Sequence, residues 1–387
     1  MPWRLVIAGC IGMFAATATA STRAPFLTDI AADLNVSLPA IANLFGLTAA
    51  VWGLSAYVVG LVSDRIGRGW FLIASPVLLA CAMAAISLVH SYAALVGLII
   101  FAAICCGSFT SSALAEVSLR ADPSHHGRAF GYVMSGQSLT LLFGVPLAAW
   151  LGSIVGWRGT HLALAGLALF SAMAMTIGLR DGAAKRMESG AGRQQRASLR
   201  QAMTGPVIRL FTALIAERVS FGLAAFYYAA YLRTTYQLPI DAVALPLVGF
   251  ALGNIVGTVI GGWVADRFPY RRINFAVTLA IAGLLAIPWF LWQSSVQLTV
   301  VLGVLFAFFN AVARPSLLAA LAEVPPEARS LVMGLNSSVA SIGWLAAALI
   351  GGWFYVGVGF GGFGPLMAAM CVVGALVVIP DSKLRLR

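Results

Sequence analysis

The chain has few charged residues, and this scarcity is its first informative property. Only 10% of its 387 residues are charged, whereas 60% are hydrophobic, and the mean hydropathy is +0.93. A soluble domain carries about 25% charged residues, so the composition indicates that lipid is the solvent. The net charge of +11 falls in short stretches between apolar runs, which is typical of membrane orientation signals and not of nucleic-acid binding.

The sequence also lacks the patterns of metal, redox and phosphate chemistry. All five cysteines lie in apolar stretches, and Cys105 and Cys106 are adjacent without ligand or redox spacing, so we interpret the cysteines as packing residues. The four histidines lie in or near loops and form no ligand set. No Gly-rich loop ending in Lys-Ser/Thr is present. We therefore expect no metal, no other cofactor and no enzymatic activity.

Long apolar runs fill the chain. A membrane helix needs about 20 apolar residues, and twelve such runs can be placed, which predicts an all-α membrane protein with twelve transmembrane helices. The first run looks like a retained span and not a cleaved leader. The runs cover residues 5–27, 41–62, 70–89, 93–118, 128–151, 160–179, 206–232, 242–265, 273–292, 297–320, 330–355 and 365–380.

The longest connection divides the chain into halves. Residues 180–205 are rich in Arg, Lys, Gly, Ser and Gln, which is typical of a solvated linker. We expect one six-helix bundle at 1–179 and another at 206–387. Most Lys and Arg residues lie at the termini, in this linker and in the connections on the same side. The positive-inside rule then predicts a multi-pass protein of the cell inner membrane with both termini in the cytoplasm.

Motifs recur half a chain apart. Gly60-Leu-Val-Ser-Asp-Arg-Ile-Gly-Arg68 is echoed by Gly262-Trp-Val-Ala-Asp-Arg-Phe, and Ala113-Leu-Ala-Glu-Val by Ala320-Leu-Ala-Glu-Val. Each copy follows an apolar run at an equivalent place. Internal repeats of this kind are how many secondary transporters are built, so we expect two pseudo-symmetric bundles.

The first of these motifs resembles the signature of the major facilitator superfamily between its second and third spans, and the resemblance covers essentially the whole chain. It implies alternating access, in which a central cavity opens to each side in turn. It also implies a cytoplasmic latch, in which a carboxylate favours the N-terminus of a helix and arginines contact helix ends and lipid phosphates. The latch candidates are Gly60, Asp64, Arg65, Gly67, Arg68, Glu116, Asp266 and Arg267.

Span five is similar to the drug and sugar efflux branch of this family, which includes arabinose-efflux-permease-like proteins and drug–proton antiporters. The similarity lies in Ser135-Gly136, Gly144-Val-Pro146 and Gly156-Trp-Arg158. One position departs from the branch, since Ala103 stands where its proton antiporters carry an arginine in span four.

Ionisable residues inside membrane spans are costly and therefore informative. Glu217 and Arg218 lie near the predicted middle of span seven, and Glu217 shares one helical face with Tyr228 and Tyr231. Burial disfavours the charged form of a carboxyl group and a nearby arginine favours it, so Glu217 is our candidate proton carrier. The alternative is a static ion pair of Glu217 with Arg218 or Arg314.

Other polar residues within the spans are candidates to line the substrate cavity. Asn310 and Arg314 lie one turn apart in span ten, where Arg314 could bind an anionic group or pair with Glu217. Arg23, just before Pro25, either guards the outer mouth of the cavity or lies at the membrane interface. Asn254 and Gln137 could hydrogen-bond a ligand or join helices.

We therefore predict a monomeric secondary transporter that interacts with a small-molecule substrate, protons and membrane lipid, and not with nucleic acid. The first hypothesis is proton-coupled efflux of a small drug-like molecule or metabolite. The alternative is proton-coupled or exchange transport of an organic anion. It is favoured by the arginines in the spans and by the alanine that stands at position 103 in place of an arginine. A third possibility is a non-transporting membrane sensor, but the apparent lack of an appended soluble domain argues against it.

Overall fold

The computed structural model describes residues 2–121, 126–180, 203–268, 270–321, 323 and 326–379. Most of the predicted linker, 180–205, therefore lies outside the described residues. The side chains of Asp64 and Arg65 also lie outside the description.

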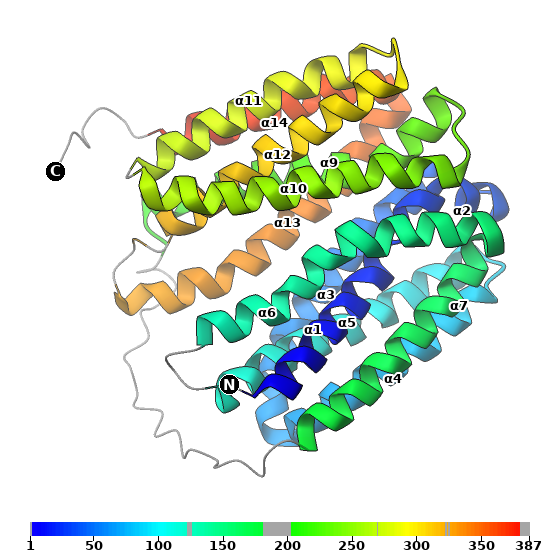
Figure 1. Cartoon of the computed structure of the whole chain (residues 1–387), viewed down its shortest axis with the longest axis vertical. Coiled ribbons are helices and arrows are strands. Elements are labelled where there is room, and N and C mark those ends of the chain that lie inside the picture. Colours follow the sequence, from blue (N-terminus) through cyan, green and yellow to red (C-terminus); the bar gives the residue numbers. More distant parts are fainter. Residues whose placement is uncertain are drawn as a thin grey trace. The chain divides into compact units, whose positions relative to one another are not determined.

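The described residues form helices joined by short turns, with no strands among them (Figure 1). The helices of the first half are α1 (Trp3–Ser21), η1 (Ala24–Phe26), α2 (Leu27–Asp33), α3 (Leu38–Ile66), α4 (Arg68–Ser87), α5 (Tyr92–Arg120), α6 (His126–Leu139), η3 (Thr140–Gly144) and α7 (Val145–Arg180). Those of the second half are α9 (Gly205–Thr235), α10 (Ile240–Arg267), α11 (Arg271–Leu291), α12 (Val296–Leu321), α13 (Pro326–Val358), η4 (Phe360–Gly362) and α14 (Phe363–Val378).

Each predicted span coincides with a helical segment. Ten described stretches are long and apolar enough to cross a membrane. One of them, Gly131–Arg180, is 50 residues long and contains two predicted spans, because Gly156 has a left-handed φ of 69° that interrupts α7. The α9 helix, which carries Glu217, is the remaining span and is not among the ten. Together they give the all-α fold of twelve membrane helices.

The chain divides into two compact units. The first comprises Met1–Gly190 with Leu238–Leu247, and the second comprises Ala191–Gln237 with Val248–Arg387. The same packing order occurs in both: α1 lies against α6 and α7 as α9 lies against α13 and α14. Likewise α4 packs on α5 and α7, and α11 packs on α12 and α14. The repeated motifs therefore belong to two pseudo-symmetric six-helix bundles.

Small residues bring helix backbones close together inside each unit. Three glycines of α10 in i, i+4 spacing lie against backbone oxygens of α12: a Cβ atom on Gly253, Gly257 or Gly261 would approach such an oxygen within 2.3–2.5 Å. In the first unit, a Cβ atom on Gly136 of α6 would lie 2.3 Å from the carbonyl oxygen of Cys10 in α1. These contacts leave no room for any side chain.

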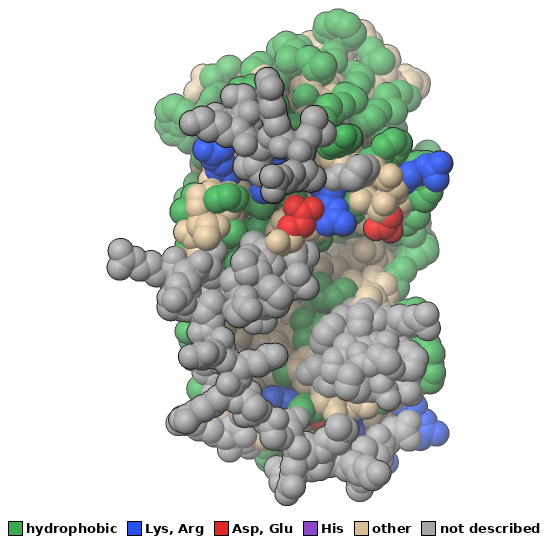
Figure 2. Space-filling model, turned by 90° about the vertical axis from the view of Figure 1, so that its left-hand side faces the viewer, with side chains coloured by type: hydrophobic (Ala, Val, Ile, Leu, Met, Phe, Trp, Pro, Cys, Tyr) green, Lys and Arg blue, Asp and Glu red, His purple; other side chains and the backbone are tan. Residues whose placement is uncertain are grey.

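The surface has the distribution of side chains expected of a membrane protein. Large apolar side chains are exposed along the outer helix faces, for example Leu54 (66%), Trp70 (73%) and Leu284 (69%). The face drawn in Figure 2 looks onto helix ends, where the described charged side chains gather, while hydrophobic side chains dominate the edges of the view. A lipid environment would cover such apolar faces.

Candidate functional site

Glu217 lies at the centre of a buried ionic cluster in the second unit. Its side chain is fully buried, and its Oε1 accepts a 2.8 Å hydrogen bond from Nε of Arg314 on α12. Its Oε2 lies 3.4 Å from Nε of Arg218, the next residue on α9. Arg314 Nη2 also donates to Oδ1 of Asn310, at 3.1 Å. We call these four residues the Glu217 cluster.

Neighbouring side chains hold the two arginines in place. The Arg314 guanidinium lies 4.2 Å from the ring centre of Phe221, which is a cation–π distance. Phe221 follows Glu217 by one helical turn, so α9 supplies both the carboxylate and the ring. On the other side, Gly343 of α13 lies under Arg218, where a Cβ atom would be 2.4 Å from the Arg218 Cβ. Glycine at position 343 of span eleven thus leaves room for Arg218 of α9.

The cluster contains more positive than negative charge. Two arginines face one carboxylate, and 15% and 19% of the Arg314 and Arg218 side chains are exposed. Three of its polar atoms have no hydrogen-bond partner among the described residues: Glu217 Oε2, Arg218 Nε and Asn310 Nδ2. Such a site has unsatisfied donors that could receive an acceptor group from a ligand.

The two tyrosines on the Glu217 face of α9 lie in an aromatic core. Tyr228 packs edge-on against Trp289, with ring centres 5.0 Å apart, and also against Phe250. The Tyr231 hydroxyl donates to the backbone oxygen of Trp289 at 3.3 Å. Both tyrosines are almost completely buried, and the Tyr228 hydroxyl has no partner among the described residues.

The remaining predicted cavity residues lie elsewhere. Asn254 of α10 is 6% exposed, and its Nδ2 has no partner in the described structure. Gln137 of α6 is exposed and lies in the first unit, as does Arg23. The structure therefore joins Glu217, Arg218 and Arg314 with Asn310, and it places Gln137 and Arg23 in the other bundle.

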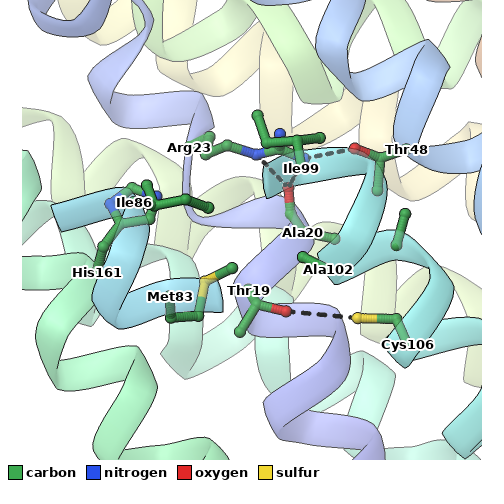
Figure 3. A pocket seen from close by; sticks show the side chains of 11 residues that line it. Thr19, Ala20, Arg23, Thr48, Met83, Ile86, Ile99, Ala102, Cys106 and His161 are labelled. Carbon is green, nitrogen blue, oxygen red and sulfur yellow. Dashed lines mark hydrogen bonds between the residues drawn. The ribbon is translucent and has the colours of Figure 1, made fainter. Parts of the chain in front are cut away.

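Arg23 faces a small cavity inside the first unit (Figure 3). It follows α1 and is only 3% exposed. Its Nη2 donates to the Thr48 hydroxyl at 2.8 Å and to the Ala20 carbonyl at 3.1 Å. Five helices contribute to the wall, whose residues are Thr19, Ala20, Arg23, Thr48, Met83, Ile86, Ile99, Ala102, Ala103, Cys106 and His161.

His161 corrects our expectation that the histidines lie in or near loops. It lies within α7, is 1% exposed, and its Nδ1 is 2.7 Å from the Trp157 carbonyl. The sequence does place Thr160 and His161 at the start of an apolar span, and this polar pair was the available signal. Ala103, the position without the expected arginine, lines the same cavity.

Both bundles have ionic contacts at the latch motifs. Gly67 closes α3 with a φ of +106°, which explains why the turn needs glycine. Arg68 then donates to the Ala115 carbonyl at 3.3 Å, beside Glu116, whose carboxylate pairs with Arg120 at 2.6 Å.

In the second unit, Arg271 donates in the same way to the Ala319 carbonyl and pairs with Glu323, both within 3.2 Å. Asp266 is exposed, and Arg267 lies 5.7 Å from the Trp263 ring centre. Gly60 is exposed on α3. The parts of the predicted latch that depend on the side chains of Asp64 and Arg65 lie outside the described residues.

Comparisons with known proteins agree with this architecture. The family model of the Major Facilitator Superfamily matches residues 9–239 and 210–386. The Inner membrane transport protein YdhP of Escherichia coli (strain K12) is 27% identical over 377 residues, which is 97% of this chain and 94% of the relative. The Chloramphenicol resistance protein of Streptomyces lividans is 27% identical over 362 residues, 92% of this chain and 91% of the relative.

A solved structure has the same fold. It is a bacterial homologue of the human lysosomal transporter Spinster, in an inward-facing and unoccupied conformation; it aligns with a TM-score of 0.75 at 15% identity over 97% of this chain and 93% of that chain. Together with twelve membrane helices and an internal repeat, these matches show that the chain belongs to the major facilitator superfamily and is a multi-pass membrane transporter, not an enzyme.

Proposed function

We propose that the protein exports a small drug-like molecule or metabolite in exchange for protons. The observation that carries this proposal is the fully buried Glu217, whose two oxygens face different arginines. A buried carboxylate that loses one of its cations is driven to take up a proton. The names of relatives, which include a chloramphenicol resistance protein, support export as the direction.

In this mechanism the bundles 1–179 and 206–387 change conformation so that the solute has access to each side of the membrane in turn, and the segment 180–205 is cytoplasmic. Glu217 is charged while Arg314 holds it, and it is protonated when rearrangement of α9 against α12 separates the pair. Arg218, Tyr228, Tyr231 and Asn254 then act on the solute from the second bundle, and Gln137 from the first. We place the monomeric protein in the inner membrane, with both termini and the latch in the cytoplasm, where arginines of the latch contact lipid phosphates.

A second function is favoured by one specific observation. The Glu217 cluster has two arginines for one carboxylate and an Asn310 Nδ2 without a partner among the described residues. A carboxylate from an organic anion could satisfy Arg218 and Asn310 together. The protein would then carry an organic anion with protons or in exchange for another anion.

Transport by purified protein in liposomes tests both functions. Vesicles with an imposed pH gradient and chloramphenicol as the first probe, followed by panels of antibiotics and organic anions, should show movement of a solute opposite to protons. Glu217→Gln should abolish proton-driven movement of the solute, because the glutamine side chain cannot take up and release a proton. The control is Asp33→Asn, which alters a partly exposed carboxylate paired with Arg158 and should keep coupled transport.

The outcomes separate the two functions. Proton-driven export that survives in Glu217→Gln would refute the role of this carboxylate. Movement of organic anions alone, lost in Arg314→Ala, would replace the first function by the second. Solute movement by the wild-type protein that does not depend on the pH gradient would refute proton coupling.

A further inference from the structure

The cavity beside Arg23 contains a buried cation without a counter-charge. Arginine stays protonated in proteins, and Arg23 is 3% exposed. Among the described residues, eleven line the cavity and none of them is acidic. A buried charge without an opposite charge is strongly unfavourable. The other polar groups in the wall are two threonine hydroxyls, one thiol and one imidazole, and none of these provides a negative charge in its neutral form.

One edge of the guanidinium is committed to protein groups and the other is not. Nε and Nη2 donate to Ala20, and Nη2 also donates to Thr48. Nη1 is buried and has no hydrogen-bond partner among the described residues. The Phe45 ring lies 5.1 Å from the guanidinium carbon, so one face of the guanidinium is already covered. The free donor therefore remains available to a ligand.

The second unpartnered group is the His161 ring. Its Nδ1 lies 2.7 Å from the Trp157 carbonyl, and a carbonyl oxygen can only accept, so Nδ1 carries the hydrogen. Its Nε2 is buried and has no partner in the described structure. In the neutral ring this Nε2 bears a lone pair, and it becomes a donor only when the ring takes up a second proton.

The thiol of Cys106 does not provide the missing charge. Its Sγ lies 3.6 Å from the Ala16 carbonyl and 3.6 Å from the Thr19 hydroxyl, as the dashed line to Thr19 in Figure 3 shows. The contact with a carbonyl oxygen requires the protonated thiol as donor. The cavity has room for a water-sized particle and not for a drug-sized solute, so the missing counter-charge must be small.

We propose that this cavity is a binding site for a single small negative charge, held by Arg23 Nη1 and by His161 Nε2, and that His161 takes up one proton when the anion enters. The titratable and charged groups that face His161 in the cavity are Arg23 and Cys106; the α4 wall contributes the apolar Met83 and Ile86. Arg23 opposes a second positive charge on His161 while the cavity lacks an anion. The anion offsets the charge that the proton adds, so the cavity keeps the net charge of Arg23 alone, and anion binding and protonation of His161 are coupled.

Two sources have this chemistry: a free halide ion, or a free small carboxylate such as formate. The site lies in the first unit, apart from the Glu217 cluster, and it does not depend on the proposed function. Its test therefore uses equilibrium binding to purified full-length protein and not transport.

The first experiment adds chloride, bromide, formate or butyrate to protein that was purified in gluconate buffer, and follows the melting temperature and proton uptake with a pH-indicator dye. We expect a saturable rise in melting temperature with a small anion and uptake of about one proton per site in weakly buffered solution. Anomalous scattering from bromide in crystals should lie between Arg23 and His161. Binding of chloride and bromide indicates a free halide, whereas binding of formate with no halide indicates a small carboxylate; butyrate is larger than the cavity and should not bind.

Three variants locate the effect. Arg23→Gln should weaken anion binding about tenfold or more, because it removes a charged donor. His161→Asn can still donate to the Trp157 carbonyl but cannot be protonated, so it should bind the anion more weakly and without proton uptake. Arg120→Gln, which changes an arginine at the far latch end of α5, should leave binding unchanged.

The result that overturns the proposal is specific. A melting temperature that responds equally to gluconate and to every small anion, or anion binding that is unchanged in both Arg23→Gln and His161→Asn, would contradict it. If Arg23→Gln does not fold, the wild-type titration and His161→Asn still decide the question. Anion binding with no proton uptake in the wild-type protein would refute the role of His161.

Discussion

Replacing Arg314 by glutamine would test the energetics of the Glu217 cluster. The variant loses the 2.8 Å bond to Glu217 Oε1 and leaves a fully buried carboxylate. Removing one partner of a buried ion pair costs about 3–5 kcal/mol. Because Arg218 remains 3.4 Å from the other oxygen, we expect the lower end of that range, about 3 kcal/mol.

The loss should be visible in a melting experiment on full-length protein in lipid nanodiscs. A domain of 150–250 residues loses about 2–4 °C per kcal/mol, so the expected fall is roughly 6–12 °C. In the double variant Glu217→Gln/Arg314→Gln neither partner of this pair is charged. Its melting temperature should therefore recover most of the fall seen in Arg314→Gln. The control Arg271→Gln breaks a half-exposed pair with Glu323, which should cost less than about 1 kcal/mol.

Two results would contradict the expected energetics of the Glu217–Arg314 pair. A melting temperature of Arg314→Gln equal to that of the wild type would mean that the pair adds nothing to stability. A double variant that is less stable than Arg314→Gln alone would mean that Glu217 is not the group left unpaired.

Three further measurements follow from the packing. Gly343→Ala should destabilise by about 1–3 kcal/mol, because its Cβ would lie 2.4 Å from that of Arg218, whereas Gly97→Ala points into open space and should be neutral in the same melting assay. Thr140→Val should cost about 0.5–1.5 kcal/mol, since its hydroxyl donates to the Phe14 carbonyl of α1; an unchanged midpoint would contradict this. Mass spectrometry after maleimide treatment should find the buried cysteines unmodified until the protein is unfolded, and modification of the folded protein would contradict their burial. These are Cys105, Cys106 and Cys371.

The fold could be predicted from the sequence because its signal is local. Each membrane helix is one apolar run, and a run is recognised without any knowledge of its neighbours. The break at Gly156 falls in the predicted connection between the runs 128–151 and 160–179, whereas the π-helical turn at Thr140–Gly144 was not predicted. Pro146 follows this turn and cannot donate to the preceding turn of helix, which gives a physical reason for the irregularity.

The sites were predictable only in part, because they depend on contacts between distant residues. The scarcity of ionisable residues in the spans pointed to Glu217 and Arg314, and the structure places them 2.8 Å apart. The cavity of Arg23 needs Thr48 and His161 from other helices, and no spacing in the sequence relates these three. Contacts between different helices leave no periodic pattern in the amino-acid sequence.

We propose that Glu217 changes its protonation state as the transporter works. Infrared difference spectroscopy on the protein in lipid, recorded as the pH is lowered and as a transported solute is added, detects a protonated carboxyl group directly. We predict a carboxyl signal that changes on solute addition in the wild-type protein and is missing in Glu217→Gln, but present in Asp33→Asn. A signal that persists in Glu217→Gln, or a wild-type protein with no solute-dependent carboxyl signal, would contradict this role of Glu217.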